Sequence, residues 1–309
     1  MEKVVVTGGA GFIGSHLAEE LVKQSYQVTI LDDLSTGKME NIASLLKKGD
    51  TEFIQGSVTD LPLLLDLFQE VKYVFHQAAL SSVPRSIEDP LATNEVNITG
   101  TLNVLIAARE NSIGKVVCAS SSSVYGDALS LPQKESMPLK PLSPYALTKL
   151  VGEHYCNIFR QIYGLHTVSL RYFNVYGPRQ DPHSQYAAVV PAFMERISHN
   201  LPPIIFGDGE QSRDFTFIQD VVRANILAAV NDASGAYNIG CGANATINQL
   251  AKTLLAFMGK DLKPVYEEPR TGDPRRTVAD VSKAMEFGYE PAWALEDGLK
   301  EIIKGLNER

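Results

Sequence analysis

The sequence predicts an α/β fold, a doubly wound parallel sheet with helices on both faces, followed by a smaller C-terminal α/β lobe. Up to about residue 170, short β-branched runs alternate with longer amphipathic stretches, which is typical of βαβ units. Runs such as Val4-Val5-Val6 and Val116-Val117 are apolar at consecutive positions, which indicates strands buried on both sides. After Arg171 the chain becomes rich in proline and glycine, which indicates a loop-rich second lobe.

The elements follow in order from these patterns. We expect strands at 3–7, 27–31, 52–55, 73–76, 115–119 and 166–171, and helices near 12–23, 61–70, 90–111 and 143–163. A further helix at 217–231 would return to the sheet. Residues 1–171 plus about 215–240 then form the sheet domain, and about 172–214 and 241–309 form the second lobe. Ligands bind such sheets at the carboxyl ends of the strands, so the cleft should lie there, between the lobes.

Composition excludes several classes of function. The formal net charge of -8 argues against a nucleic-acid-binding protein, although a few arginines could still hold an anionic substrate. The three cysteines lie far apart without a C-x-x-C pair, so we expect neither a disulfide framework nor a metal site. The N-terminus lacks a signal-peptide core, and no apolar run approaches the roughly 20 residues that span a bilayer. We therefore expect a soluble, cytoplasmic protein without a membrane partner.

The first predicted turn has the pattern of a dinucleotide site. Thr7-Gly8-Gly9-Ala10-Gly11-Phe12-Ile13-Gly14 follows the first strand and opens the first helix. Glycines at 8, 11 and 14 allow a tight turn, close approach of a pyrophosphate and packing of the helix on the sheet, and the helix N-terminus favours phosphate. We assign Gly8, Gly11, Phe12, Ile13 and Gly14 to cofactor binding. Together with the alternating strands, this turn predicts a Rossmann-type domain.

Two acidic residues follow later strands. Asp32 ends the second strand, 18 residues beyond Gly14, where a carboxylate accepts hydrogen bonds from the adenosine ribose and repels a 2′-phosphate. NAD is therefore favoured over NADP, although Asp32 could instead be a turn residue. Asp60 follows the third strand, where it could meet the adenine amine or cap the helix that starts at residue 61.

A tyrosine, a lysine and a serine run supply candidate catalytic groups. Tyr145 and Lys149 are four residues apart and lie on one face of a predicted helix. A free tyrosine has a pKa of about 10, which a neighbouring ammonium and an oxidised nicotinamide would lower, so that the phenolate could accept a proton from a substrate hydroxyl. Ser120-Ser121-Ser122-Ser123 follows the fifth strand, where a hydroxyl can donate to the substrate oxygen or relay its proton. Either pattern by itself also fits a helix-surface pair or a loop.

With the glycine turn, Asp32, the serine run and the Tyr145/Lys149 pair in this order, the chain resembles the extended short-chain dehydrogenase/reductase family. Segments at 76–79, 97–101, 171–179 and 213–215 match it as well. Within that family the chain looks most like the UDP-hexose 4-epimerases, especially those that accept N-acetylated sugars. The resemblance implies tightly bound NAD, a UDP-sugar substrate and an isomerase that passes through a transient 4-keto sugar.

The resemblance also assigns roles to residues. Tyr145 would be the base, Lys149 its tuner and ribose anchor, and Ser121 or Ser122 the hydroxyl partner. Gln77 and Asn97 fall in matching segments and are assigned to the cofactor. Asn174 would contact the diphosphate or sugar, and Arg213 and Arg270 would grip the diphosphate, although either arginine could be a surface ion pair. Thr277 leaves room for an acetamido group, to which Ser82 could bond.

Other members of the family remain alternatives. Sugar 4,6-dehydratases carry an Asp-Glu pair directly after the catalytic hydroxyl, where this chain has Ser122-Ser123, and UDP-glucuronate decarboxylases carry a glutamate there. Dehydration and decarboxylation are therefore disfavoured. A UDP-glucuronate 4-epimerase stays open, because Arg179 or Arg276 could receive a carboxylate. Non-enzymatic members commonly lose the tyrosine or the lysine, and both are present here. The family further implies a homodimer through the helices near 90–111 and 143–163, and the sequence does not name the preferred UDP-sugar.

Overall fold

A seven-stranded parallel sheet forms the centre of the molecule. The computed structural model describes residues 1–47, 49, 51–128, 130–182, 188–269 and 275–307. The strand order is β11-β6-β5-β4-β1-β2-β3, and every neighbouring pair is parallel. The strands are β1 (Lys3–Thr7), β2 (Gln27–Asp32), β3 (Thr51–Gln55), β4 (Val71–His76), β5 (Lys115–Ser121), β6 (Thr167–Tyr172) and β11 (Gly235–Ile239). This architecture confirms the predicted doubly wound α/β fold, with the reversal of strand order between β1 and β4.

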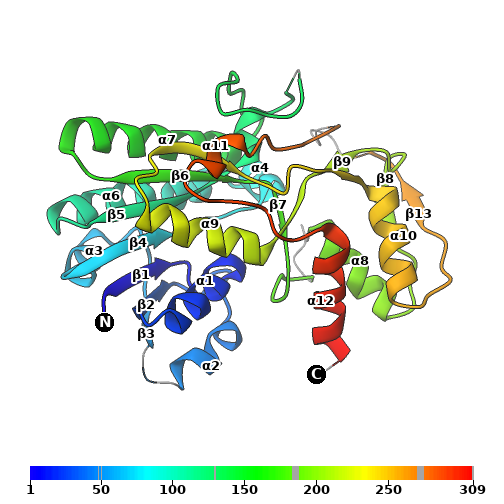
Figure 1. Cartoon of the computed structure of the whole chain (residues 1–309), viewed down its shortest axis with the longest axis horizontal. Coiled ribbons are helices and arrows are strands. Elements are labelled where there is room, and N and C mark those ends of the chain that lie inside the picture. Colours follow the sequence, from blue (N-terminus) through cyan, green and yellow to red (C-terminus); the bar gives the residue numbers. More distant parts are fainter. Residues whose placement is uncertain (48, 50, 129, 183–187, 270–274, 308–309) are drawn as a thin grey trace.

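Helices cover both faces of this sheet (Figure 1). On one face α1 (Phe12–Lys23) packs against α9 (Ile218–Val230), and on the other α6 (Gly100–Glu110) packs against α3 (Leu61–Leu67) and α7 (Pro144–Tyr163). Val4 and Val6 belong to the first hydrophobic core and Val5 to the second, and all three are fully buried. The consecutive apolar residues of β1 therefore serve two cores at once.

The segment predicted as one helix at 90–111 is interrupted. It consists of α5 (Pro90–Asn94), a wide π-helical turn at Glu95–Thr99 and α6. A Cβ on Gly100 would lie 2.5 Å from Cγ2 of Val58, so the glycine lets the chain pass close to the segment after β3. A short helix that was not predicted, α4 (Val83–Glu88), precedes α5 and is capped by Ser82.

Strand β11 was also not predicted, although its region was expected to rejoin the sheet. Its sequence Gly-Ala-Tyr-Asn-Ile has no apolar run, and the strand is specified by its pairing with β6. Shorter helical segments that were not predicted are α2 (Ala43–Leu46) and single turns at Met39–Asn41 and Ser122–Tyr125.

The other described residues after β6 include small sheets and helices that lie beside the main sheet (Figure 1). Three two-stranded sheets pair β10 (Phe215–Phe217) with β7 (Asn174–Tyr176), β12 (Ala245–Thr246) with β9 (Ser212–Arg213), and β13 (Val265–Glu267) with β8 (Ile204–Phe206). The helices are α8 (Val189–Ser198), α10 (Ile247–Phe257), α11 (Ser282–Met285) and α12 (Leu295–Asn307), and α10 packs on both α8 and α12. No helix in the described part of the chain is both long enough and apolar enough to cross a membrane.

Candidate active site

A cavity of about 740 Å³ lies at the carboxyl ends of the central strands. It spans the position where the strand order reverses, between β1 and β4, which is where ligands bind in sheets of this kind. Its walls combine the glycine turn, the end of β2, the loop after β4 and residues of α7, among them Gly8, Gly11, Phe12, Ile13, Gly14, Asp32, Gln77, Ser82, Ser120, Tyr145, Lys149, Tyr172 and Arg179. The fold thus collects most of the predicted cofactor residues in one place.

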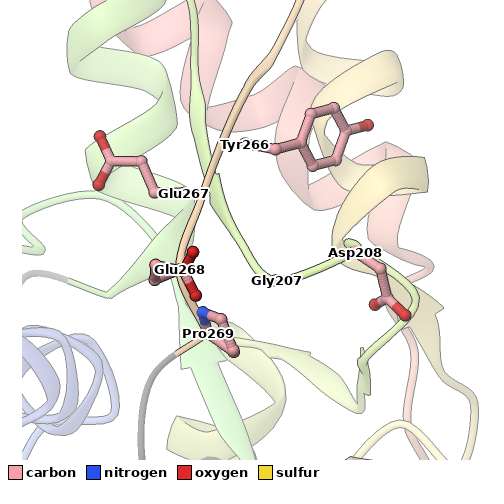
Figure 2. Close-up of a pocket in the computed structure, with 6 residues that line it drawn as sticks. All are labelled: Gly207, Asp208, Tyr266, Glu267, Glu268 and Pro269. Carbon is pink, nitrogen blue, oxygen red and sulfur yellow. The ribbon is translucent and has the colours of Figure 1, made fainter.

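A second hollow, of about 870 Å³, lies between the loop after β8 and strand β13 (Figure 2). Its lining contains none of the predicted site residues. Tyr266 and Glu267 point to opposite sides of β13 in Figure 2, so the polar groups do not converge on a common point. Of the two hollows, only the cavity at the sheet edge carries an arrangement for chemistry.

The glycine turn packs so closely against other backbone atoms that a side chain would clash there. Gly8 has a φ of 67°, and a Cβ there would lie 2.6 Å from the amide nitrogen of Ala78. A Cβ on Gly14 would lie 2.2 Å from the carbonyl oxygen of Gly8. Helix α1 begins directly after Gly11 without a side-chain cap, so its first N–H groups remain available at the cavity. These observations fit a dinucleotide pyrophosphate seated on the start of α1.

Asp32 holds the turn and also faces the cavity. The residue is 7% exposed, and its carboxylate accepts hydrogen bonds from the amides of Ala10 (3.0 Å) and Leu34 (2.8 Å). Burial raises the pKa of Asp32, although these backbone hydrogen bonds act in the opposite direction. The turn role and a ribose role are therefore compatible, because an ionised carboxylate has lone pairs beyond those two bonds.

Helix α7 delivers the tyrosine and the lysine together. Ser143 caps its N-terminus by accepting from the amide of Ala146 (3.1 Å), and the amide of Tyr145 donates to the hydroxyl of Ser86 (3.1 Å). The amine of Lys149 lies 5.9 Å from the centre of the Tyr145 ring and donates to the carbonyl of Ala119 (2.8 Å). The end of β5 and the start of α7 are thereby fixed to each other.

Burial governs the protonation of this pair. It raises the pKa of Tyr145, against the lowering effect of a hydrogen bond with Ser121, and it lowers the pKa of Lys149 to about 8. In the protein without a cofactor, desolvation of the phenol is the larger effect, and the lowering of the tyrosine pKa by Lys149 together with an oxidised nicotinamide stays a prediction. Within the serine run, Ser121 forms a side-chain hydrogen bond with Tyr145, and Ser120 lines the cavity. Ser122 begins the helical turn that follows β5.

Three other residues assigned to the cofactor have different surroundings. Gln77 lines the cavity and donates to Oδ1 of Asn225 (3.0 Å). Asn97 is 3% exposed and bonds to both the amide and the carbonyl of Leu80, so it supports the loop after β4 from behind. Asp60 caps α3 by accepting from the amide of Leu63 (3.1 Å) and does not line the cavity. The cap alternative thus accounts for Asp60.

The residues assigned to the substrate are spread over several elements. Ser82 lines the cavity and caps α4, while the Thr277 hydroxyl donates to Oδ1 of Asn174 (3.4 Å) beyond the cavity wall. Arg213 is 6% exposed and donates to the carbonyl of Ser212. Arg276 is exposed, and Arg270 lies outside the described residues.

Arg179 reaches the cavity from the side of α1. It forms an ion pair with Glu19 and donates to the hydroxyl of Ser15 (3.3 Å), and its φ of 66° is unusual for a residue with a side chain. Its guanidinium is therefore committed to α1.

Several residues that line the cavity were not singled out from the sequence. Lys38 and Asp181 form an ion pair of 3.5 Å between the loop after β2 and the loop after β7. Arg85, on α4, has no side-chain partner within the described part of the chain. Only the tertiary fold brings these residues together, so no local pattern could have identified them.

Comparison with known proteins gives one consistent family. Residues 4–240 match the profile of the NAD dependent epimerase/dehydratase family. A putative UDP-glucose 4-epimerase of Methanocaldococcus jannaschii is 40% identical over 305 residues, which covers 98% of each chain. The structure of a UDP-N-acetylglucosamine 4-epimerase from Methanobrevibacter ruminantium, in complex with UDP-N-acetylmuramic acid, has a TM-score of 0.96 at 42% identity and covers 99% of this chain and 98% of its own.

A relative with an acidic substrate is also similar. The structure of a UDP-glucuronic acid 4-epimerase from Bacillus cereus, in complex with UDP-glucuronic acid and NAD, has a TM-score of 0.91 at 36% identity and covers 98% of this chain and 99% of its own. The comparisons therefore include proteins that act on different sugars.

Proposed function

The chain belongs to the NAD dependent epimerase/dehydratase family, and on this premise we propose that it interconverts the C4 epimers of a UDP-hexose through a transient 4-keto sugar. The observation that carries the proposal is that Tyr145 and Lys149 line one cavity together with the glycine turn, while Ser121, at the end of β5, forms a hydrogen bond with Tyr145. The absence of an acidic pair next to Ser121 in the sequence supports epimerisation over dehydration. UDP-glucose and UDP-N-acetylglucosamine are the substrates we favour.

NAD is the cofactor, and its nicotinamide, when bound, supplies the hydride acceptor and a positive charge. Gly8, Gly11 and Gly14 would hold the pyrophosphate at the start of α1, and Asp32 would hold the adenosine ribose. Tyr145 would take the proton from O4 of the sugar, with Ser121 bonded to the same phenol. Lys149 would steady the phenolate and bond to the nicotinamide ribose through the N–H groups not used on Ala119.

The remaining assignments form the substrate side of this proposal. We propose that residues about 172–214 and 241–309 form the lobe that binds the nucleotide-sugar, while 1–171 and about 215–240 bind NAD. Asn174, Arg213, Arg270 and Thr277 would meet the UDP-sugar there, together with Ser82 from the cavity wall. The contact between Thr277 and Asn174 supports placing both at one position.

A UDP-glucuronate 4-epimerase is the second candidate, and Arg85 is the observation that favours it. Of the cations that line the cavity, Lys38 and Arg179 pair with carboxylates and Lys149 belongs to the catalytic group. Within the described residues, that leaves Arg85 able to receive a carboxylate. Arg85 would take the place of the two receivers predicted from the sequence, because Arg179 is paired with Glu19 and Arg276 is exposed and does not line the cavity.

The test is a comparison of UDP-glucose, UDP-N-acetylglucosamine and UDP-glucuronate as substrates without added cofactor, with wild type and Tyr145→Phe. We expect turnover of the neutral sugars, and a loss of at least a hundredfold in kcat for Tyr145→Phe with its bound NAD retained. Turnover of the acidic sugar alone would replace our proposal by the second candidate. Full activity in Tyr145→Phe would refute the assigned base.

A further inference from the structure

A buried ion pair lies directly behind the cavity wall. Arg171 on β6 donates from Nε to Oε1 of Glu153 on α7 (2.8 Å) and from Nη2 to Oε2 (2.7 Å). Their side chains are 4% and 8% exposed. Replacing such a pair by apolar residues is often neutral or stabilising, so stability alone gives a weak reason for its presence.

The ion pair reaches the cavity through a residue that the sequence did not single out within the serine run. Ser120 lies opposite Arg171 in the register of β5 and β6, and its Oγ is 2.5 Å from Oε1 of Glu153. Ser120 is 4% exposed and lines the cavity. It is therefore in contact with the ion pair on one side and with the ligand space on the other.

The direction of the hydrogen bond follows from the chemistry of the three groups. A guanidinium can only donate, and an ionised carboxylate can only accept. The Ser120 hydroxyl must therefore donate its single hydrogen to Glu153. What remains for the cavity is its lone pairs, so Ser120 can accept a hydrogen bond from a ligand but cannot donate one.

The far end of the pair is anchored as well. Nη1 of Arg171 donates to the hydroxyl of Tyr125 (2.8 Å), which donates to Oδ1 of Asn238 on β11 (2.6 Å). These bonds use the Arg171 nitrogen that does not contact Glu153, so the two bonds from Arg171 to Glu153 do not depend on them. Since Arg171, Tyr125 and Asn238 are buried and the side chain of Glu153 is 8% exposed, water competes little for the bonds.

We propose that the Glu153–Arg171 pair is a positioning device that holds Ser120 as an obligate hydrogen-bond acceptor for an N–H or O–H group of the bound ligand. The donor is either the carboxamide of the nicotinamide or a hydroxyl of the sugar. This inference rests on the proposed function. It adds to Tyr145, Lys149 and Ser121 a residue that binds a donor group of the ligand and takes no part in proton transfer.

The test compares wild type with Ser120→Ala in two measurements. Calorimetry gives the Kd of NAD and of its 3-acetylpyridine analogue, which lacks the amide N–H groups, and steady-state assays give kcat and KM for the UDP-hexose. Loss of one neutral hydrogen bond should weaken the affected step about fivefold. If the donor is the carboxamide, Ser120→Ala weakens NAD but not the analogue. If the donor is a sugar hydroxyl, both nucleotides bind as before and kcat/KM falls about fivefold.

A second pair of variants tests the positioning itself. Glu153→Leu combined with Arg171→Met removes both charges and the acceptor of the Ser120 hydrogen, so that neither charge is left buried alone, and should reproduce at least the loss seen in Ser120→Ala. Tyr125→Phe is the matched control, because it cuts the same network on the far side while leaving the bond between Glu153 and Ser120. It should keep both nucleotide affinity and kcat/KM.

Two outcomes would overturn the inference. One is Ser120→Ala with unchanged affinities and unchanged kinetics. The other is a loss of affinity or of kcat/KM in Tyr125→Phe that equals the loss in the double variant, with both losses following the fall in Tm, because the network would then act only through stability. A wild type that binds NAD but turns over no UDP-hexose would instead refute the proposed function, and the calorimetric comparison would still decide the role of Ser120 toward the cofactor.

Discussion

Replacing Lys149 by methionine should make the ligand-free protein more stable at pH 7 while removing its activity. Burial lowers the pKa of Lys149 from 10.5 to about 8. That difference corresponds to a penalty of about 3 kcal/mol for keeping the ammonium in the folded protein at neutral pH. Methionine avoids the penalty but loses the hydrogen bond to the Ala119 carbonyl, which contributes about 1 kcal/mol. The net gain in the free energy of unfolding should be about 2 kcal/mol.

The pH dependence gives this prediction its sign. At pH 7 the lysine is protonated in both the folded and the unfolded state, so the folded protein bears the whole penalty. Between pH 8 and 10.5 the folded protein has released the proton while the unfolded chain still holds it, so the stability of the wild type rises through this window. The advantage of Lys149→Met should therefore shrink above pH 8. Above pH 10.5 only the lost hydrogen bond remains, and the variant should be slightly less stable than wild type.

Urea denaturation of the ligand-free proteins at pH 7 and at pH 10.5 measures both effects. Lys252→Met is the matched control, because Lys252 is exposed on α10, and its effect should not change with pH. The kcat of Lys149→Met should fall at least a hundredfold. A variant that is less stable than wild type at pH 7, or a stability difference that is the same at both pH values, would refute the reasoning.

Further predictions concern the cofactor and the assembly. Gly14→Ala should purify without bound NAD, measured by its absorbance after acid release, because the new Cβ would lie 2.2 Å from the Gly8 carbonyl; retained NAD would contradict the role of the turn. Asp32→Asn should lower the preference for NAD over NADP at least tenfold by calorimetry, because the repelling charge is removed, and an unchanged ratio would exclude the ribose role. We also propose a homodimer through α7 and its neighbours, since Ile158 and Ile162 are 42% and 69% exposed. Light scattering should then show a dimer for wild type and a monomer for Ile158→Lys/Ile162→Lys, and a monomeric wild type would refute it.

The parts of this protein that the sequence predicted are those with a local signature. The strands of the main sheet carry consecutive apolar residues because each strand faces two cores, as Val4 and Val5 do. The glycine turn is recognisable because the close contacts that require glycine lie within a few residues of sequence. Strand β11 was missed because it has no such run and depends on its pairing with β6. The break in the helix at 90–111 depends on the contact between Gly100 and Val58, which is invisible to helical periodicity.

The site divides in the same way. Tyr145 and Lys149 share one helix, so their spacing places them together before anything is known of the fold. The role of Ser120 could not be predicted, because it depends on Glu153 from α7 and Arg171 from β6 meeting behind one strand. Asp60 differs from Ser120 in this respect: its position before a predicted helix indicated a helix cap, and the structure shows that cap.

The electrostatics of the cavity explain why its groups need a ligand while other buried charges do not. Glu153 and Arg171 satisfy each other, and buried Asp214 accepts hydrogen bonds from the amides of Cys241, Gly242 and Ala279. Lys149, by contrast, uses one of its three N–H donors on a carbonyl within the described residues, and burial disfavours the charged forms of both Lys149 and Tyr145. A protein selected for stability alone would replace such groups, since each uncompensated buried charge costs folding free energy. Their concentration at one cavity is expected for a site whose charged groups gain their partners only when the dinucleotide and the sugar are bound. For the same reason, the gain in stability of Lys149→Met and its loss of activity should occur together.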